Sequence, residues 1–174
     1  MRTKIQPTVA TAVFLAVAPG GVAGLVPWLL SRWRMAPPFL GIGALRWLGV
    51  ALIAAGTPIL LDSFVRFARE GSGTPAPVYP TDRLIITGLY RYMRNPMYVG
   101  VTAIVAGQGL LLGSAPVLAY GVVLWLGFHL FVRLHEEPGL QRRYGAQFTA
   151  YCAGVRRWLP RLTPWHDARV TKEG

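Results

Sequence analysis

Acidic residues and cysteine are scarce in this chain, and each shortage excludes a class of protein. Asp and Glu number 7 against 18 Lys and Arg among 174 residues, and charged residues make up 14% of the chain. With one cysteine, Cys152, neither an internal disulfide nor a zinc site of the CxxC type can form. Soluble domains usually carry more charge, so the low charge and 53% hydrophobic content predict a membrane protein.

The net charge of +11 raises the question of a nucleic-acid partner. The arginines, however, gather at the ends of apolar segments and form no stripe with interleaved aromatic residues. This pattern suits anionic lipid headgroups, so we expect contact with membrane lipids and no nucleic acid. The length fits one membrane domain, residues 1–174.

Long apolar segments predict an all-α integral membrane protein with about four transmembrane helices. A helix needs about 20 apolar residues to cross the hydrocarbon, and the predicted spans are 9–30, 42–67, 96–113 and 116–134. The first begins like a signal peptide but stays apolar to its end without a cleavage site, so we expect a retained helix. Only the short stretch SAP separates the last two, which predicts a tight C-terminal helical hairpin.

Arginines also predict the orientation of the bundle. The loop 68–95, the C-terminal tail and the N-terminus fall on one side and carry most of the basic residues. The positive-inside rule therefore predicts that both termini are cytoplasmic and that the chemistry lies on that face. We expect the tail to lie at the interface, with Trp158 and Trp165 as anchors.

The stretch RYMRNPMYVG, residues 91–100, concentrates polar side chains where the third span begins. Asn95 is a favoured N-cap and Pro96 fits the first helical position, so we expect a helix to start here. The arginines and tyrosines then serve as ordinary interfacial anchors. Alternatively, the free N–H groups at this helix start bind an anionic ligand. The stretch alone leaves both interpretations open.

A second polar group follows the fourth span, where Glu136 and Glu137 lie at the predicted exit from the bilayer. A solvated helix end is one interpretation, and it suits Glu137 in particular. Negative charge is unfavourable at a helix C-terminus, so a ligand or an arginine partner is the alternative, chiefly for Glu136. The three histidines lack metal-ligand spacing with a carboxylate, and no Gly-x-Gly pair follows a strand, so we expect no metal and no Rossmann site.

Taken together, TGLYRYMRNPMYVG, the apolar hairpin and EEPGLQRRYGAQFTAYCAGVRRWLP resemble the isoprenylcysteine carboxyl methyltransferase and phospholipid methyltransferase superfamily. The resemblance covers 82–160, with motifs at 82–100 and 133–160. It implies a bacterial-type inner-membrane enzyme that transfers a methyl group from S-adenosylmethionine. The implied acceptor is a lipid-like or prenylated small molecule, methylated on a carboxylate or on a headgroup amine.

The resemblance also implies the site residues. Arg133 stands beside Val132, which occupies the position of the family's substrate-side arginine, and with Glu136 it is a candidate catalytic residue. Asn95 stands where many members have His, and because Asn takes no proton near neutrality, no general base is expected at this position. The implied cofactor-binding residues are Asp82, Arg83, Leu84, Ile85, Tyr90, Asn95, Pro96, Met97, Tyr98 and Glu136.

Two other functions remain open at this point. One is an NADPH-dependent membrane lipid reductase of the steroid-reductase type, and the other is a non-catalytic small transporter or assembly protein. A transporter is expected to carry ionisable residues near the bilayer centre, whereas here they cluster at one edge. Binding of a sulfonium nucleoside, of a nicotinamide nucleotide, or of neither separates the three functions.

Overall fold

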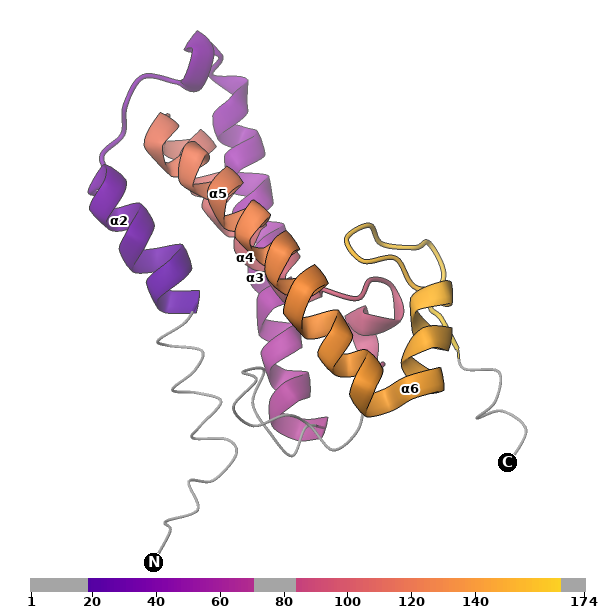
Figure 1. The fold of residues 1–174 in the computed structure, drawn as a ribbon. Helices are drawn as coiled ribbons and strands as arrows, with labels where there is room; N and C mark the ends of the chain where they lie inside the picture. Colours follow the sequence, from indigo (N-terminus) through magenta and orange to yellow (C-terminus); the bar gives the residue numbers. More distant parts are fainter. Residues whose placement is uncertain (1–18, 71–83, 167–174) are drawn as a thin grey trace, which may run out of the picture.

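A computed structural model describes residues 19–70 and 84–166 of the chain, and this part is helical with no strand (Figure 1). The predictions for 1–18, 71–83 and 167–174 lie outside the described residues. The elements are η1 (Gly21–Leu25), α2 (Val26–Ser31), η2 (Phe39–Gly41), α3 (Ala44–Glu70), η3 (Gly88–Arg91), α4 (Pro96–Leu112), α5 (Ala115–Phe131), η4 (Val132–Glu136) and α6 (Glu137–Gly154).

Helices α3 and α4 pack closely because glycines line their contact. A Cβ on Gly107 would lie 2.6 Å from the Gly49 carbonyl oxygen, and a Cβ on Gly56 would lie 2.7 Å from that of Gly100. From Gly49 to Gly56 the contact moves forward along α3 and backward along α4, from Gly107 to Gly100, so the helices are antiparallel. Small residues let helix backbones approach in this way. This close packing fixes the position of α4 against α3.

The predicted hairpin is present between α4 and α5. Gly113 ends α4 in the left-handed conformation, with φ of 68°, which glycine adopts without strain. The Ser114 side chain then caps α5 by accepting a hydrogen bond from the Val117 N–H at 3.5 Å. The short connection places the start of α4 and the end of α5 at the same end of the bundle (Figure 1).

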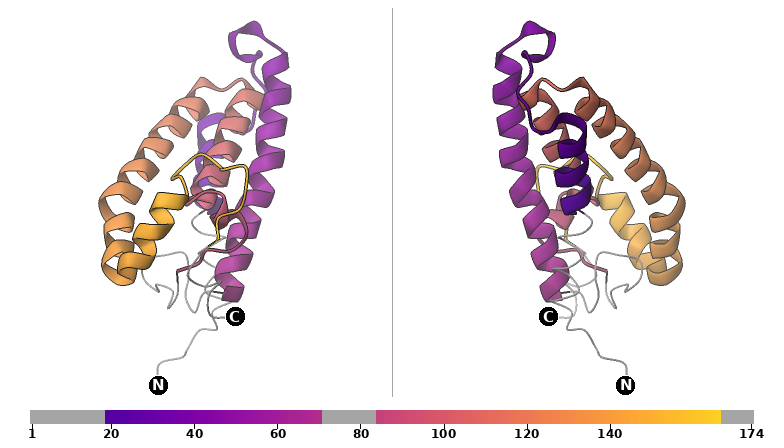
Figure 2. Two further views of the ribbon diagram at one scale, coloured as in Figure 1. Left: turned by 90° about the vertical axis from the view of Figure 1, so that its right-hand side faces the viewer. Right: turned by 90° about the vertical axis from the view of Figure 1, so that its left-hand side faces the viewer.

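The helix after the hairpin is longer than the predicted fourth span. It continues from α5 through the π-helical turn η4 into α6 and ends at Gly154, bending at Gly145, where φ is 49° and ψ is −123°. Residues 155–165 then turn back as irregular chain toward the start of α4 (Figure 2). The predicted span 116–134 stays a prediction, because the end of an apolar segment marks the end of a span and the helix itself continues beyond it.

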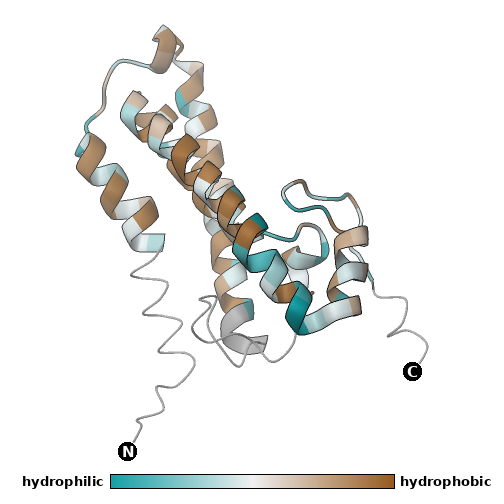
Figure 3. Cartoon of the chain, viewed as in Figure 1, coloured by the Kyte–Doolittle hydropathy of each residue, from teal (hydrophilic) through white to brown (hydrophobic). Residues whose placement is uncertain are grey.

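The outer surface of the bundle is apolar over most of its length. Large side chains such as Trp47 and Leu126 are 76% and 47% exposed. In Figure 3 the mostly hydrophobic residues of α5 give way to more polar ones as the helix continues toward α6. Two helical segments are long and apolar enough to cross a membrane, Ala44–Arg66 and Ala115–Gly154. Gly21–Ser31 and Pro96–Leu112 are apolar but shorter, so the count of four spans stays a prediction.

Candidate active site

Three segments far apart in sequence meet at one end of the bundle: η3 with the start of α4, η4 with α6, and residues 155–165 (Figure 1). Backbone hydrogen bonds fix the last segment against the first. The bonds run from Arg94 N to Arg156 O at 2.9 Å, from Arg161 N to Tyr92 O at 3.0 Å, and from Trp165 N to Arg91 O at 2.9 Å. The residues of both sequence motifs are therefore brought together.

Tyr90 anchors η3 in the protein interior. Its side chain is buried, its carbonyl accepts a 2.6 Å hydrogen bond from the Tyr151 hydroxyl, and its own hydroxyl shares a hydrogen bond with Ser63. Burial raises the pKa of Tyr90 well above its usual value, and the hydrogen bond with Ser63 offsets only part of the rise. The phenol therefore stays neutral at physiological pH and can donate or accept a hydrogen bond.

Tyr98 joins the first turn of α4 to η4. Its hydroxyl donates a 2.9 Å hydrogen bond to Oε2 of Glu136, and its ring packs on Phe128 with centroids 4.6 Å apart. Oε1 of Glu136 has no hydrogen-bond partner within 19–70 and 84–166. Desolvation by burial, with the nearby Glu137 charge, raises the pKa of Glu136, while the Tyr98 hydrogen bond lowers it. A shielded carboxylate oxygen is thus left to accept from a ligand.

Glu137 has a different environment from its neighbour. Its Oε1 lies 3.0 Å from Nη1 of Arg94, and Arg157 binds both of its oxygens, at 2.8 Å through Nε and 2.7 Å through Nη2. The side chains of Arg94, Glu137 and Arg157 are 13%, 17% and 27% exposed, and the hydrogen bonds to Glu137 raise the pKa of Arg157. The expectation of a solvated Glu137 is wrong, because residues 155–165 fold back toward the start of α4 and bring Arg157 to its carboxylate.

Asn95 precedes α4 as expected, but its side chain does not cap the helix. Its Nδ2 instead donates a 3.2 Å hydrogen bond to the carbonyl of Arg157. Asn95 is 6% exposed and Pro96 is fully buried. Met97 points into the bundle and packs against the core cluster that contains Phe64. Asn95 therefore holds residues 155–165 in place, and this role replaces the predicted capping hydrogen bond.

The other predicted site residues are distributed around this centre. Leu84 packs on the cluster of Phe148 and Tyr151, while Ile85 is half-buried. Arg133 is exposed and lines a recess with Glu137. Asp82 and Arg83 lie outside the described residues. The structure thus groups Tyr90, Tyr98 and Glu136 and directs Arg133 to the adjoining recess.

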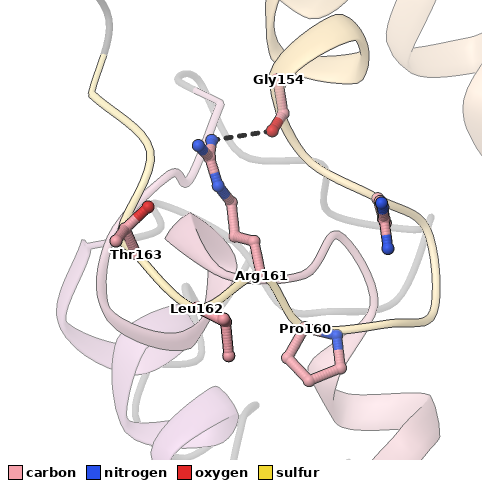
Figure 4. A pocket seen from close by; sticks show the side chains of 6 residues that line it. Gly154, Pro160, Arg161, Leu162 and Thr163 are labelled. Atoms are coloured by element: carbon pink, nitrogen blue, oxygen red, sulfur yellow. Dashed lines mark hydrogen bonds between the residues drawn. The ribbon is translucent and has the colours of Figure 1, made fainter.

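Residues 155–165 form an ordered cover for the start of α4. Within this segment the Arg161 guanidinium donates a 2.8 Å hydrogen bond to the Gly154 carbonyl, beside a recess of about 450 Å³ (Figure 4). Trp165 packs edge-on against Tyr151, with ring centroids 5.6 Å apart, and Trp158 donates a 3.1 Å hydrogen bond to His129. Trp165 is half-buried on the cluster of Phe148 and Tyr151, and the interfacial position of the tail stays a prediction.

Several residues of this region escaped sequence reasoning. Ser63 and Tyr151 gave no signal, because each contacts Tyr90 through the fold alone. Arg94 and Arg157 did give one, since each lies in one of the two polar motifs, 82–100 and 133–160. Sequence could not show that both bind Glu137. Within the described parts of the chain, no group of three or more His, Cys, Asp or Glu residues could hold a metal ion.

Comparison with known proteins gives one family match. The family model for phospholipid methyltransferase matches residues 44–147, from the start of α3 into α6. No curated protein and no solved structure gives a significant match. The matched region covers more than half of the chain and contains Tyr90, Tyr98 and Glu136, so the resemblance predicted from the sequence motifs is confirmed. The chain is a membrane protein and belongs to the phospholipid methyltransferase family.

Proposed function

We propose that this protein transfers a methyl group from S-adenosylmethionine to the polar headgroup of a membrane lipid. When bound, this cofactor supplies an electrophilic methyl group on a positively charged sulfur. Family membership supports methyl transfer to a lipid-like acceptor. We place the reaction where η3, the first turn of α4 and η4 meet, on the cytoplasmic side of the membrane.

The observation that carries the proposal is the Tyr98–Glu136 pair. Glu136 is half-buried, is neutralised by no arginine, and keeps Oε1 unbound in the described structure. A shielded carboxylate favours a cationic or hydroxyl-bearing ligand, because hydrogen bonds to charged groups are about twice as strong as neutral ones. Both the ammonium and the ribose of the cofactor fit that description. Glu136 is therefore the residue we assign to hold the cofactor.

The neighbouring residues suit the remaining parts of the cofactor. The first N–H groups of α4 lack intrahelical partners and carry partial positive charge, which suits the cofactor's carboxylate. The rings of Tyr90 and Tyr98 provide negative faces for a sulfonium. Asn95 and Pro96 are buried at this helix start, and the Asn95 side chain donates a hydrogen bond to residues 155–165. The remaining residues that we propose for the binding site are Asp82, Arg83, Leu84, Ile85 and Met97.

Positioning carries most of the catalytic work in this proposal. Methyl transfer requires the acceptor, the methyl group and the sulfur in line, and a well-oriented site can supply several kcal/mol of the barrier. Tyr90, Tyr98 and Glu136 lie on three different elements, and side-chain hydrogen bonds join Tyr98 to Glu136 and Tyr151 to the Tyr90 carbonyl. Residues 155–165 cover the start of α4 and limit the access of water there. Arg133 stands beside this centre, where it can steer an anionic part of the acceptor.

Calorimetry on the purified protein in detergent tests the proposal. We expect saturable binding of S-adenosylmethionine and S-adenosylhomocysteine and none of NADPH. Glu136→Gln should weaken binding roughly tenfold or more, because it removes a charge-assisted hydrogen bond. Tyr98→Phe should weaken it less, since it removes only the hydroxyl that orients Glu136. Tyr92→Phe, which removes a hydroxyl with no partner among the described residues, is the matched control.

Transfer of labelled methyl groups to extracted lipids then tests the reaction itself. We expect a labelled lipid product with the wild type and a strongly reduced yield with Glu136→Gln. Binding of NADPH in place of the sulfonium compounds would establish the reductase alternative. Absence of saturable binding of either cofactor would remove enzymatic function and leave the non-catalytic alternative.

A further inference from the structure

The turn that follows α6 carries two leucines that protrude from the protein. Leu162 is fully exposed, at 100%, and Leu159 is 62% exposed. Figure 4 shows the side chain of Arg161 reaching toward Gly154, while that of Leu162 points away from it. The tip of this turn, residues 158–163, therefore presents an apolar edge to its surroundings.

Trp158 fixes the position of this turn beside α5. Its Nε1 donates the 3.1 Å hydrogen bond to Nδ1 of His129, and its ring packs near that of Trp125 with centroids 6.4 Å apart. Trp125 and His129 belong to the predicted span 116–134 and precede the end of α5 at Phe131. Figure 1 and Figure 2 show the chain after α6 reaching back along the bundle to α5. The turn thus lies beside a predicted membrane span instead of projecting away from it.

The backbone of the turn suits the boundary between lipid headgroups and acyl chains. Irregular chain is tolerated at membrane depth only where its polar groups are satisfied. Pro160 and Pro164 have no N–H group. The N–H groups of Arg161 and Trp165 donate to carbonyl oxygens of η3 and the residue that follows it. The number of unpaired donors is thus lowered, and water near the headgroups can satisfy the rest.

The charges around the turn favour an anionic lipid surface. Arg156 is exposed, and Arg161 is half-buried. Residues 154–163 contain no acidic residue. Basic side chains beside an inserted apolar tip can reach back to lipid phosphates, and each adds attraction to an anionic leaflet. A second copy of this chain is a poor partner for the same surface, because its own net charge is +11.

We propose that residues 158–163 form a re-entrant turn that inserts Leu159 and Leu162 into the membrane leaflet at this end of the bundle. The leucines and not Trp165 make this contact, because Trp165 packs against Tyr151. The same turn is hydrogen-bonded to the segment that precedes α4. The bilayer is then the partner that holds the cover, residues 155–165, against the start of α4. This inference is independent of cofactor binding.

A fluorescent probe at position 162 tests the insertion. Leu162→Cys, in a Cys152→Ser background, is labelled with the environment-sensitive dye NBD. The full-length protein is then placed in nanodiscs of phosphatidylethanolamine and phosphatidylglycerol. Val123→Cys, 66% exposed on apolar α5, is the control for lipid, and Arg142→Cys, exposed on α6, is the control for water.

We expect the emission of the position-162 probe, and its quenching by doxyl-labelled lipids, to resemble those of the probe at position 123. Emission and quenching like those of the probe at position 142 would overturn the proposal. Blue-shifted emission that lipid quenchers leave unchanged would mean that protein covers the turn, and would overturn it as well.

Limited tryptic digestion in the same nanodiscs tests whether lipid holds the cover. Residues 155–165 contain three arginines at which trypsin can cleave. We expect Leu162→Ser to be cleaved roughly tenfold faster than the wild type, because one leucine side chain leaving an apolar medium changes an equilibrium by about that factor or more. Leu162→Met keeps an apolar side chain and should be cleaved at the wild-type rate. Leu162 is fully exposed, so neither change removes packing within the protein, and equal rates in the two variants would refute the role of lipid.

Discussion

Replacing Glu137 with Gln removes the carboxylate charge that joins two separate parts of the chain. In the wild type this side chain binds Arg94, just before α4, and Arg157, in the folded-back segment. In the variant both guanidinium groups remain largely buried and lose their counter-charge. Arg94 keeps a contact with the Cys152 sulfur, a weak acceptor. We therefore expect residues 155–165 to detach more readily from the start of α4.

The size of the effect follows from the burial of the three side chains. Removing one partner of a buried pair costs about 3–5 kcal/mol, and a hydrogen bond to a charged group contributes about 1.5–3 kcal/mol. Exposed fractions of 13%, 17% and 27% place this cluster below the buried limit. Because Gln keeps one acceptor oxygen, we expect a loss of about 2–3 kcal/mol in the free energy of unfolding. For a chain of this size that corresponds to a fall in melting temperature of roughly 5–10 °C.

Two measurements check the prediction: thermal unfolding in detergent and the rate of tryptic cleavage within residues 155–165. Both should change in Glu137→Gln, and the double variant with Arg157→Gln should be less destabilised than the sum of the single variants. Asp62→Asn is the control. It breaks an ion pair whose side chains are 25% and 33% exposed and should cost about 1 kcal/mol or less. Strict additivity in the double variant, with unchanged cleavage in Glu137→Gln, would refute the reasoning.

Three further predictions concern packing, backbone and topology. Gly107→Ala places a methyl group against the α3 backbone and should lower the free energy of unfolding by about 1–3 kcal/mol, measured by thermal unfolding. Gly127→Ala, with open space around it, is the control and should have no such effect. Equal melting temperatures of the two variants would contradict the close contact. Gly145→Ala should cost about 1–3 kcal/mol by the same measurement, because φ of 49° and ψ of −123° strain any other residue, and no loss would contradict the bend. Reporters fused within 71–76 and at the C-terminus should both report the cytoplasm, and one near Pro37 the opposite side; disagreement between the first two would exclude the predicted orientation.

Sequence reasoning located the helices because their signals are local. The apolar stretch 42–67 became α3, Ala44–Glu70, and the stretch 96–113 became α4, Pro96–Leu112. Asn95 and Pro96 marked the start of α4 through their own backbone preferences. The fourth span was predicted to end near residue 134 because hydropathy falls there, but the helix continues through η4 into α6. Hydropathy indicates where a helix leaves apolar surroundings. The backbone hydrogen bonds of the helix do not depend on hydropathy, so they continue where the surroundings are polar.

The candidate site, too, was predicted from the sequence only in part. Tyr98 and Glu136 were predicted members of one site, and they meet in the fold at 2.9 Å although 38 positions separate them. Their binding of the cofactor and the role of Arg133 stay predictions, as does the count of four spans. The expected capping by Asn95 and the solvated state of Glu137 were wrong for one shared reason. Both side chains contact Arg157, and the position of that residue depends on where the chain turns after Gly154.

The sequence by itself determined that this is an apolar helical membrane protein with its few carboxylates and many arginines at one end. It did so because hydropathy and helix-start preferences depend on neighbouring residues along the chain. Tertiary structure alone decided which carboxylate is neutralised and which keeps a free oxygen. Glu136 and Glu137 are identical in chemistry and adjacent in sequence. Consecutive residues of a helix point in different directions, so one meets Tyr98 of α4 and the other meets the arginine brought back by residues 155–165.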